Sequence, residues 1–337
     1  MTVVINMRDG VDKGKLSVAV RFILDGKLVA FPTETVYGLG ADALNEKAVR
    51  RIFEAKGRPA DNPLIVHIAR FEDLTMLARE VPDEAELLVR KFWPGPLTLV
   101  LPKRETVPDV TTGGLNTVAV RMPAHPVALA LIRESTPIAA PSANISGRPS
   151  PTLAEHVIED FYGRIGCIID AGKTPIGVES TVIDLSSEEP TLLRPGGLPV
   201  EKIEEVIGEV KIHPAVRGKM VEVAKAPGMK YRHYAPNALL ILVEGPKGEI
   251  GEKITALVRE YRSKGFKVGV MATRKYDADE FVHLGSTDVE VARNVFRGLR
   301  ELDKRGVDVI IAEGIEERGL GFAVMNRLRK AAKYRVL

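Results

Sequence analysis

Short apolar runs alternate with amphipathic stretches from residue 17 to residue 207. Apolar runs bounded by Gly, Pro or Asp are typical of buried strands, and apolar positions three and four apart are typical of helices that pack on a sheet. Two of the expected helices span 47–55, with Val49, Ile52 and Phe53 on one stripe, and 84–92, with Leu87, Leu88 and Phe92 on another. The expected strands are 28–31, 64–68, 97–101, 118–122, 138–140, 167–170, 181–185 and 192–194. The pattern predicts an α/β domain with a mixed sheet and flanking helices.

The periodicity stops between residues 213 and 236, where Pro and Gly recur. This segment predicts a linker, although its sequence KYRHY at 230–234 is more basic and aromatic than a plain spacer. A second alternating pattern follows and predicts a small Rossmann-like parallel sheet. Its strands are expected at 239–243, 268–272 and 307–312, and its helices at 253–263, 289–304 and 323–332. We therefore expect a domain at 1–212, a linker at 213–236 and a domain at 237–337.

Composition is compatible with this two-domain organisation and narrows the class of protein. A chain of 337 residues exceeds the usual size of one hydrophobic core, and 45% hydrophobic with 28% charged residues is ordinary for a soluble protein. The net charge of +3 indicates no general affinity for nucleic acid. Cys167 is the only cysteine, which excludes an internal disulfide and a multi-cysteine metal site.

The N-terminus lacks the apolar core of a signal peptide, and no apolar run reaches the ~18 to 20 residues that span a bilayer. We therefore expect a cytoplasmic protein without a membrane segment. Glutamine is absent while Glu, Lys and Arg are abundant, a composition typical of thermophiles.

The familiar nucleotide-binding and catalytic motifs are not found with the residue spacing that they require. Gly172-Lys173-Thr174 lacks the upstream glycine of a phosphate-binding loop, because Cys167 stands at that position, and a turn between strands is the simpler interpretation. The second domain has no GxGxxG, since Gly319 and Gly321 fit a turn better. The histidines show no metal-binding spacing, and no covalent nucleophile is indicated.

Basic, hydroxyl and amide residues instead gather where predicted strands of the first domain end, the usual place for ligands of α/β sheets. They form six blocks: PTETVYGL at 32–39, KGRP at 56–59, RMP at 121–123, PSANISG at 141–147, ESTV at 179–182 and LRPG at 193–196. Each block alone has an ordinary explanation. Thr33 and Thr35 share a face of a strand if residue alternation holds, Lys56 and Arg58 suit the C-terminus of a helix, and Ser and Asn favour turns.

Taken in this order, the six blocks resemble the threonylcarbamoyl-AMP synthase family, whose catalytic domain has a YrdC-like fold. The linker sequence GMKYRHYAP and the closing block from Leu299 to Ala332 are similar to the two-domain members. The resemblance implies a nucleotidyltransferase that converts L-threonine, bicarbonate and ATP to threonylcarbamoyl-AMP and pyrophosphate. Mg²⁺ is implied with ATP, held mainly by phosphates and water because no carboxylate cage is apparent.

The same resemblance implies residue roles. Arg121 would pair with the threonine carboxylate. Thr33 is a close alternative to Thr35, and His67 could instead be a core histidine with its hydrogen bonds satisfied. The implied ATP-binding residues are Lys56, Arg58, Asn62, Thr117, Ser142, Asn144, Ser150, Arg194 and Tyr234. The implied threonine-binding residues are Thr35, His67, Arg121, Ala140 and Ser180.

The resemblance also implies a downstream threonylcarbamoyl transferase complex that acts on tRNA, while direct tRNA binding stays open. Two alternatives are an RNA-binding module without catalysis, which would not explain the hydroxyl and amide blocks, and a carbamoyl-AMP-forming carbamoyltransferase, which would need a cysteine-rich zinc motif. The linker is expected to act as a lid over the nucleotide, with Tyr234 near ATP. The sequence gives the second domain no chemical role, and it leaves the oligomeric state open.

Overall fold

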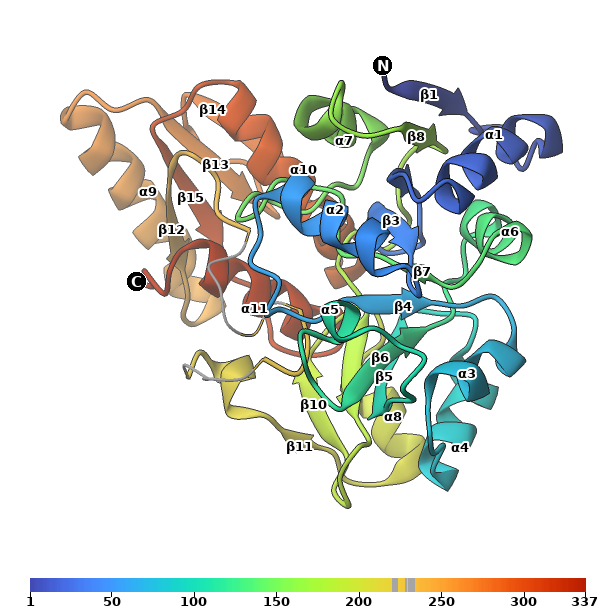
Figure 1. Ribbon diagram of the computed structural model, residues 1–337. Coiled ribbons are helices and arrows are strands. Elements are labelled where there is room, and N and C mark those ends of the chain that lie inside the picture. Colours follow the sequence, from blue (N-terminus) through green and yellow to red (C-terminus); the bar gives the residue numbers. More distant parts are fainter. Residues whose placement is uncertain (220–223, 228, 230–233) are drawn as a thin grey trace. The chain divides into compact units, whose positions relative to one another are not determined.

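The computed structural model describes residues 1–219, 224–227, 229 and 234–337. It divides into two compact units, Met1–Ser146 with Ser150–Lys230, and Gly147–Pro149 with Tyr231–Leu337 (Figure 1). Residues 230–233 of the expected lid lie outside the described part of the chain. No helix in the described residues is both long enough and apolar enough to cross a membrane.

The first unit is built on a mixed sheet of short strands, as the pattern predicts. Within the described residues the sheet has eleven strands in the order β1-β8-β2-β3-β7-β4-β6-β5-β9-β10-β11. The strands are β1 (Val3–Asn6), β2 (Val29–Phe31), β3 (Gly38–Asp42), β4 (Ile65–His67), β5 (Leu97–Pro102), β6 (Thr117–Arg121), β7 (Ile138–Ala139), β8 (Cys167–Asp170), β9 (Thr181–Asp184), β10 (Thr191–Arg194) and β11 (Lys211–Ile212). β4 and β6 run parallel with His67 opposite Arg121, so both side chains stand at the carboxyl ends of their strands.

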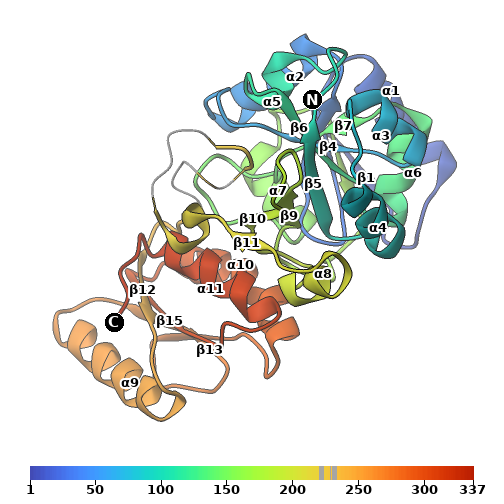
Figure 2. The same cartoon turned by 90° about the horizontal axis from the view of Figure 1, so that it is seen from below.

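Helices cover both sides of this sheet, with α1 and α6 on one side and α2 and α5 on the other (Figure 2). The helices are α1 (Lys13–Leu24), α2 (Glu46–Lys56), α3 (Phe71–Leu77), α4 (Asp83–Phe92), α5 (Asp109–Thr112), α6 (Pro126–Glu134), α7 (Ala154–Phe161) and α8 (Val200–Ile207). In α2 the predicted stripe of Val49, Ile52 and Phe53 is buried. In α4 the prediction is wrong at Leu87, which is 51% exposed, because Ala85, Leu88 and Val89 form the buried face.

The strand β3 was not predicted, and its glycines explain why. Glycine weakens a strand by propensity, so Gly38 and Gly40 hide the pattern. At Gly40 a Cβ atom would lie 2.7 Å from Ile138 Cγ2 and 2.8 Å from the Phe31 ring. The absence of a side chain therefore allows β3 to lie against β2 and β7, where packing outweighs propensity.

The second unit contains a parallel sheet, in agreement with the Rossmann-like prediction. Its described strands lie in the order β12 (Leu239–Val243), β15 (Val309–Glu313), β13 (Val268–Ala272) and β14 (Glu280–His283). Every pairing between them is parallel. Figures 1 and 2 show α9 (Lys247–Ser263) on one face and α10 (Asp288–Lys304) and α11 (Leu320–Ala331) on the other. The short strand β14 was not predicted, because Phe281 and Val282 are the only apolar residues of its four.

The described residues of the predicted linker pack with one unit or the other. Pro214–Arg217 form a 3₁₀ turn, and Ala224, Ala226 and Met229 join a cluster of buried apolar residues on the sheet of the first unit. Tyr234 stacks on Phe296 of the second unit, with ring centroids 5.2 Å apart. The first unit accordingly continues to Lys230, past the predicted domain end at residue 212.

This packing generates a stability prediction for Ala226, which is fully buried in the cluster. Ala226→Asp places an unpaired carboxylate among apolar side chains, and we expect it to lower the free energy of unfolding by at least about 3 kcal/mol. Lys219→Asp, at an exposed position nearby, is the control and should change stability by no more than about 0.5 kcal/mol. Denaturant unfolding followed by circular dichroism measures both, and equal effects would show that the segment does not contribute to the core.

Candidate active site

The C-terminus of α2 presents two buried cations. The helix ends where Gly57 adopts the left-handed conformation, with φ of 61°, which turns the chain so that Lys56 and Arg58 both point inward. Lys56 is 3% exposed and its Nζ donates to the carbonyls of Ser142 (2.5 Å) and Asn144 (2.6 Å). Arg58 is 8% exposed and donates to the Asn62 carbonyl at 3.2 Å. Main-chain carbonyl oxygens thus hold both side chains in place.

Residues 140–150 connect this helix end to the first polar block. The Ala140 amide donates to the Ile65 carbonyl, and Ser142 forms a bridge with Gly38. Asn144 is buried, and its side-chain amide donates to the neighbouring Ile145 carbonyl at 2.9 Å. The loop is thus fixed by main-chain bonds from both sides.

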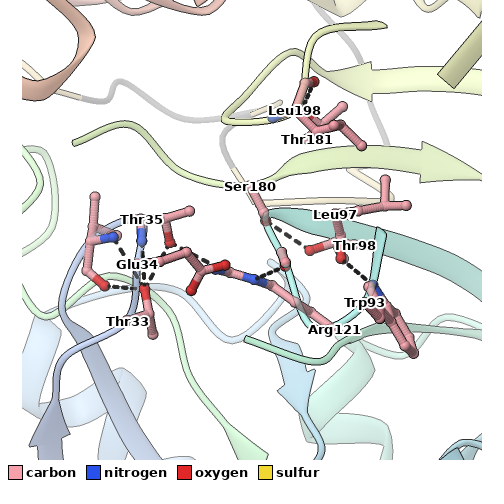
Figure 3. Close-up of polar contacts among 12 residues, drawn as sticks. Thr33, Glu34, Thr35, Trp93, Leu97, Thr98, Arg121, Ser180, Thr181 and Leu198 are labelled. Carbon is pink, nitrogen blue, oxygen red and sulfur yellow. Dashed lines mark hydrogen bonds and ion pairs between the residues drawn. The ribbon is translucent and has the colours of Figure 1, made fainter. Parts of the chain in front are cut away.

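A buried ion pair forms the centre of the second group of predicted residues. Arg121, at the end of β6, donates from Nη2 to Glu34 Oε1 at 2.5 Å and from Nη1 to Thr35 Oγ1 at 2.9 Å (Figure 3). Its Nε donates to the Gly95 carbonyl at 3.2 Å. The Arg121 and Glu34 side chains are only 4% and 9% exposed, so the pair is shielded from solvent. Burial strengthens such a pair but makes the loss of either partner costly.

The two threonines of the first block have different partners. Thr33 Oγ1 donates to the Val36 carbonyl at 2.6 Å and accepts from the amides of Thr35 and Val36. It therefore closes a turn, whereas Thr35 faces Arg121. The strand-alternation argument was wrong here, because β2 ends at Phe31 and the two hydroxyls meet at 2.8 Å across a bend.

His67 is buried beside Arg121. Burial, and then the positive charge of Arg121, lower its pKa from 6.5 to about 3, so the imidazole is neutral at physiological pH. Its Nδ1 is buried and has no hydrogen-bond partner among the described residues. The ring also meets Phe31 edge-on at 6.0 Å. The side chain thus combines the packing of a core histidine with a free polar atom that a ligand could contact.

Ser180 and Arg194 form a third group. Ser180 Oγ and Thr98 Oγ1 lie 2.7 Å apart (Figure 3). Arg194 Nη2 donates to the Ser180 carbonyl at 2.9 Å and to its Oγ at 3.1 Å. Arg194 is 5% exposed and its Nη1 donates to the Pro227 carbonyl. This guanidinium therefore ties the end of β10 to the segment that follows η1 (Pro214–Arg217).

The remaining predicted residues are placed as follows. Asn62 is completely buried, and neither polar atom of its amide has a partner in the described part of the chain. Ser150 Oγ donates to Glu179 Oε1 at 2.7 Å. Thr117 is half-buried at the start of β6, opposite Pro102. Tyr234 lies in the second unit, where its ring stacks on Phe296 and the Arg327 guanidinium lies 5.5 Å from the ring centroid.

Main-chain bonds join these groups within the first unit. The amides of Ile176 and Gly177 donate to the carbonyls of Glu34 and Thr35, and the Ala143 amide donates to the Tyr37 carbonyl. The blocks PTETVYGL, PSANISG and the segment before ESTV are therefore adjacent, although they are far apart in sequence. Gly172-Lys173-Thr174 lies in the irregular connection between β8 and β9, where no helix follows it as a phosphate-binding loop would require.

Sequence reasoning missed Glu34, Glu179 and Thr98. Glu34 lies between Thr33 and Thr35, and strand alternation would place its side chain on the opposite face of the strand from theirs. Glu179 begins the ESTV block, so its position carried a signal. Thr98 lies within an apolar strand, and nothing in the sequence distinguishes it from a residue chosen for strand propensity.

No group of three or more His, Cys, Asp or Glu side chains in the described residues could hold a metal ion. The polar side chains of the site are mainly cations, hydroxyls and amides, and the carboxylates of Glu34 and Glu179 accept hydrogen bonds from Arg121 and Ser150.

The neutral His67 generates a stability prediction. The unfolded chain binds a proton at His67 near pH 6.5 and the folded chain does not until about pH 3, so stability falls as the pH drops below 6.5. Between pH 7 and pH 5 this group should remove about 2 kcal/mol. His67→Asn should weaken the pH dependence by that amount. Guanidinium unfolding of the wild type and the variant at both pH values tests this, and an unchanged slope in His67→Asn would contradict it.

Comparison of the chain with known proteins identifies its family. The family model described as telomere recombination matches residues 21–196, and the model described as threonylcarbamoyl-AMP synthase, C-terminal domain, matches 198–333. A threonylcarbamoyl-AMP synthase of Pyrococcus abyssi is 66% identical over 100% of this chain and 99% of its own length. That of Bacillus subtilis is 50% identical over 96% of this chain and 94% of its own.

Solved structures agree with these matches. The crystal structure of P. abyssi Sua5 complexed with L-threonine superposes with a TM-score of 0.99 at 66% identity, and the match covers 100% of this chain and 99% of that one. E. coli YciO, at 23% identity and a TM-score of 0.54, shares the fold of the first unit over 58% of this chain and 96% of its own. With both family models matched in order and relatives aligned over nearly the whole length, the chain belongs to the threonylcarbamoyl-AMP synthase family.

Proposed function

We propose that this enzyme forms threonylcarbamoyl-AMP and pyrophosphate from L-threonine, bicarbonate and ATP, for use in tRNA modification. The observation that carries the proposal is the buried Arg121, held by Glu34, Thr35 and the Gly95 carbonyl, in a chain 66% identical to a protein crystallised with L-threonine. A guanidinium has five N–H groups, and these contacts use three, so two remain for a substrate carboxylate.

The reaction has two steps that balance without a protein nucleophile. The threonine amine attacks bicarbonate and gives a carbamate with loss of water. A carbamate oxygen then attacks the α-phosphorus of ATP, and the bond to the bridging oxygen of pyrophosphate breaks. Such a displacement depends on alignment and on stabilisation of charge in the transition state.

Lys56 and Arg58 are the residues best placed to stabilise that charge. Both are nearly buried and both are anchored by carbonyl oxygens. A preorganised cation in a site that excludes water stabilises a developing negative charge more strongly than a solvated one. Asn62 supports a ligand contact beside them, since its buried amide has no partner among the described residues.

Mg²⁺ accompanies ATP in this proposal. Because the described residues offer no cluster of carboxylates for it, the metal ion is held by the triphosphate and water, with any hydroxyl of the site as a further ligand. It would neutralise phosphate charge, and the residues of the chain position the phosphates.

Burial of the basic residues disfavours the RNA-binding alternative. Lys56, Arg58, Arg121 and Arg194 are at most 8% exposed, whereas counterion release by RNA requires accessible cations. A single cysteine also excludes the zinc motifs of the carbamoyltransferase alternative. The product would pass to a downstream threonylcarbamoyl transferase complex that acts on tRNA.

The first test measures pyrophosphate release in the presence of ATP and Mg²⁺. Release should require L-threonine and bicarbonate together, because the carbamate is the nucleophile. L-Serine, which lacks only the methyl group, should be disfavoured by about 1 to 3 kcal/mol. ATP consumption that is independent of threonine would refute the proposed reaction.

The second test concerns Arg58. Arg58→Ala should lower kcat/KM at least about tenfold, since a charge-assisted hydrogen bond contributes about 1.5 to 3 kcal/mol. Arg58→Lys should stay impaired because an ammonium cannot reproduce the planar fork. Arg90→Ala, an exposed arginine of α4, is the control. Normal kinetics in Arg58→Ala would show that this side chain does not contact the phosphates.

A further inference from the structure

Glu34 carries a buried carboxylate oxygen that its ion pair does not use. The residue is 7% exposed, and Oε1 accepts the Arg121 hydrogen bond. Oε2 is buried and accepts no hydrogen bond within the described residues. Leaving a buried carboxylate oxygen without a donor is costly, and this site already contains an oriented cation on the other oxygen. A ligand that brings one donor to Oε2 would remove that cost.

The chemistry of the substrate limits what that donor can be, and this step rests on the proposed function. Besides its carboxylate, threonine offers an amine and a side-chain hydroxyl. The amine becomes the carbamate and must be directed toward the α-phosphate of ATP. The carboxylate is assigned to the two remaining N–H groups of Arg121. The carbamate nitrogen keeps one N–H, but its position is set by the reaction, so the hydroxyl is the donor that takes no part in the chemistry and is assigned to the partner of Arg121.

We propose that Glu34 determines specificity by accepting a hydrogen bond from the side-chain hydroxyl of the substrate amino acid. In threonine a single carbon atom separates the carboxyl carbon from the carbon that bears the hydroxyl. Groups that bind these two functions must therefore be neighbours themselves. Arg121 and Glu34 meet this condition, because they are in direct contact at 2.5 Å (Figure 3).

The other hydroxyl-binding candidates are less suited. Thr35 Oγ1 already interacts with Thr33 and Arg121, and Ser180 Oγ with Thr98 and Arg194. His67 Nδ1 is a second buried atom with no partner in the described residues. A hydrogen bond to a carboxylate is about twice as strong as one between neutral groups, so Glu34 is the stronger acceptor.

The experiment compares three amino acids that separate the two features of the threonine side chain. L-Serine keeps the hydroxyl and lacks the methyl, whereas L-2-aminobutyrate keeps the methyl and lacks the hydroxyl. Titration calorimetry gives their dissociation constants on the full-length protein without nucleotide, and pyrophosphate release gives kcat/KM. Binding is thus measured independently of catalysis.

In the wild type we expect threonine to be preferred over 2-aminobutyrate by at least about 100-fold, because a site built to bind a hydroxyl rejects the analogue that lacks it. Glu34→Gln keeps the shape and an acceptor for Arg121 but removes the charge, and should reduce this preference at least about tenfold. Glu34→Ala should reduce the preference for threonine over 2-aminobutyrate to less than about tenfold. The preference for threonine over serine should stay within about threefold in both variants, because the methyl contacts are untouched.

Glu179→Gln is the matched control, because Glu179 is also a 7% exposed glutamate and accepts from Ser150. It should leave the ratio of threonine to 2-aminobutyrate unchanged, whatever it does to the affinity for ATP. Thermal melting monitors folding of each variant, and the isosteric Glu34→Gln provides the decisive ratio if Glu34→Ala does not fold.

Each other outcome has a defined meaning. If Glu34 only positions Arg121, or contacts water, its variants weaken all three amino acids equally and the ratio stays constant, which overturns the proposal. A ratio that collapses in His67→Asn but not in Glu34→Gln assigns the hydroxyl to His67 and also overturns it. The proposal is also overturned if the wild type binds threonine no better than 2-aminobutyrate. If the wild type binds threonine but releases no pyrophosphate, the proposed function fails while the ratio still tests Glu34.

Discussion

The first unit depends on four buried cations that are held by main-chain carbonyls. Lys56 donates to the carbonyls of residues 142 and 144, Arg58 to 62 and 63, Arg121 to 95, and Arg194 to 180 and 227. Irregular loops have carbonyls that no strand or helix satisfies, and a buried carbonyl requires a donor. Each cation therefore fixes loops that could not otherwise be buried. Arg121 also forms an ion pair with Glu34, so main-chain carbonyls and a carboxylate together fix its guanidinium.

The sheet provides the rigid frame for these loops. β4 and β6 run parallel and end together at His67 and Arg121, and the short strands of the unit leave long connections at their ends. Glycine makes this geometry possible at Gly40, where a Cβ would collide with Phe31 and Ile138. A substitution that displaced β3 would also displace the loop from Thr33 to Tyr37, and with it the partners of Arg121. Packing in the core is thus coupled directly to the position of the polar groups.

The sequence predicted the frame better than the site. Strands 167–170, 239–243 and 268–272 agree with the structure because each is a mainly apolar run with clear ends. The ends of some helices differ from the prediction, as at α9, which begins six residues before the predicted start and directly after Pro246. At the candidate site, the structure brings several of the polar blocks together, yet strand alternation did not predict the bend after Phe31 and did not select Glu34. Periodicity describes regular backbone, and the functional loops are not regular. Nor could the sequence place Tyr234, whose ring lies against residues about 60 and 90 positions later in the chain.

In the proposed reaction, the buried pair of Arg121 and Glu34 would orient the substrate as well as recognise it. A substrate held by its carboxylate on Arg121 and by its hydroxyl on Glu34 has two of its three polar groups fixed by side chains that are themselves immobilised by burial. Only the amine remains free to react, and its direction is set by the chirality of the α-carbon. Binding energy from the two non-reacting groups is thereby used to orient the reacting one, which lowers the entropic cost of bringing amine, bicarbonate and nucleotide together. The same arrangement explains why no general base or covalent nucleophile has to be assigned among the described residues, since orientation and charge stabilisation supply what the displacement needs.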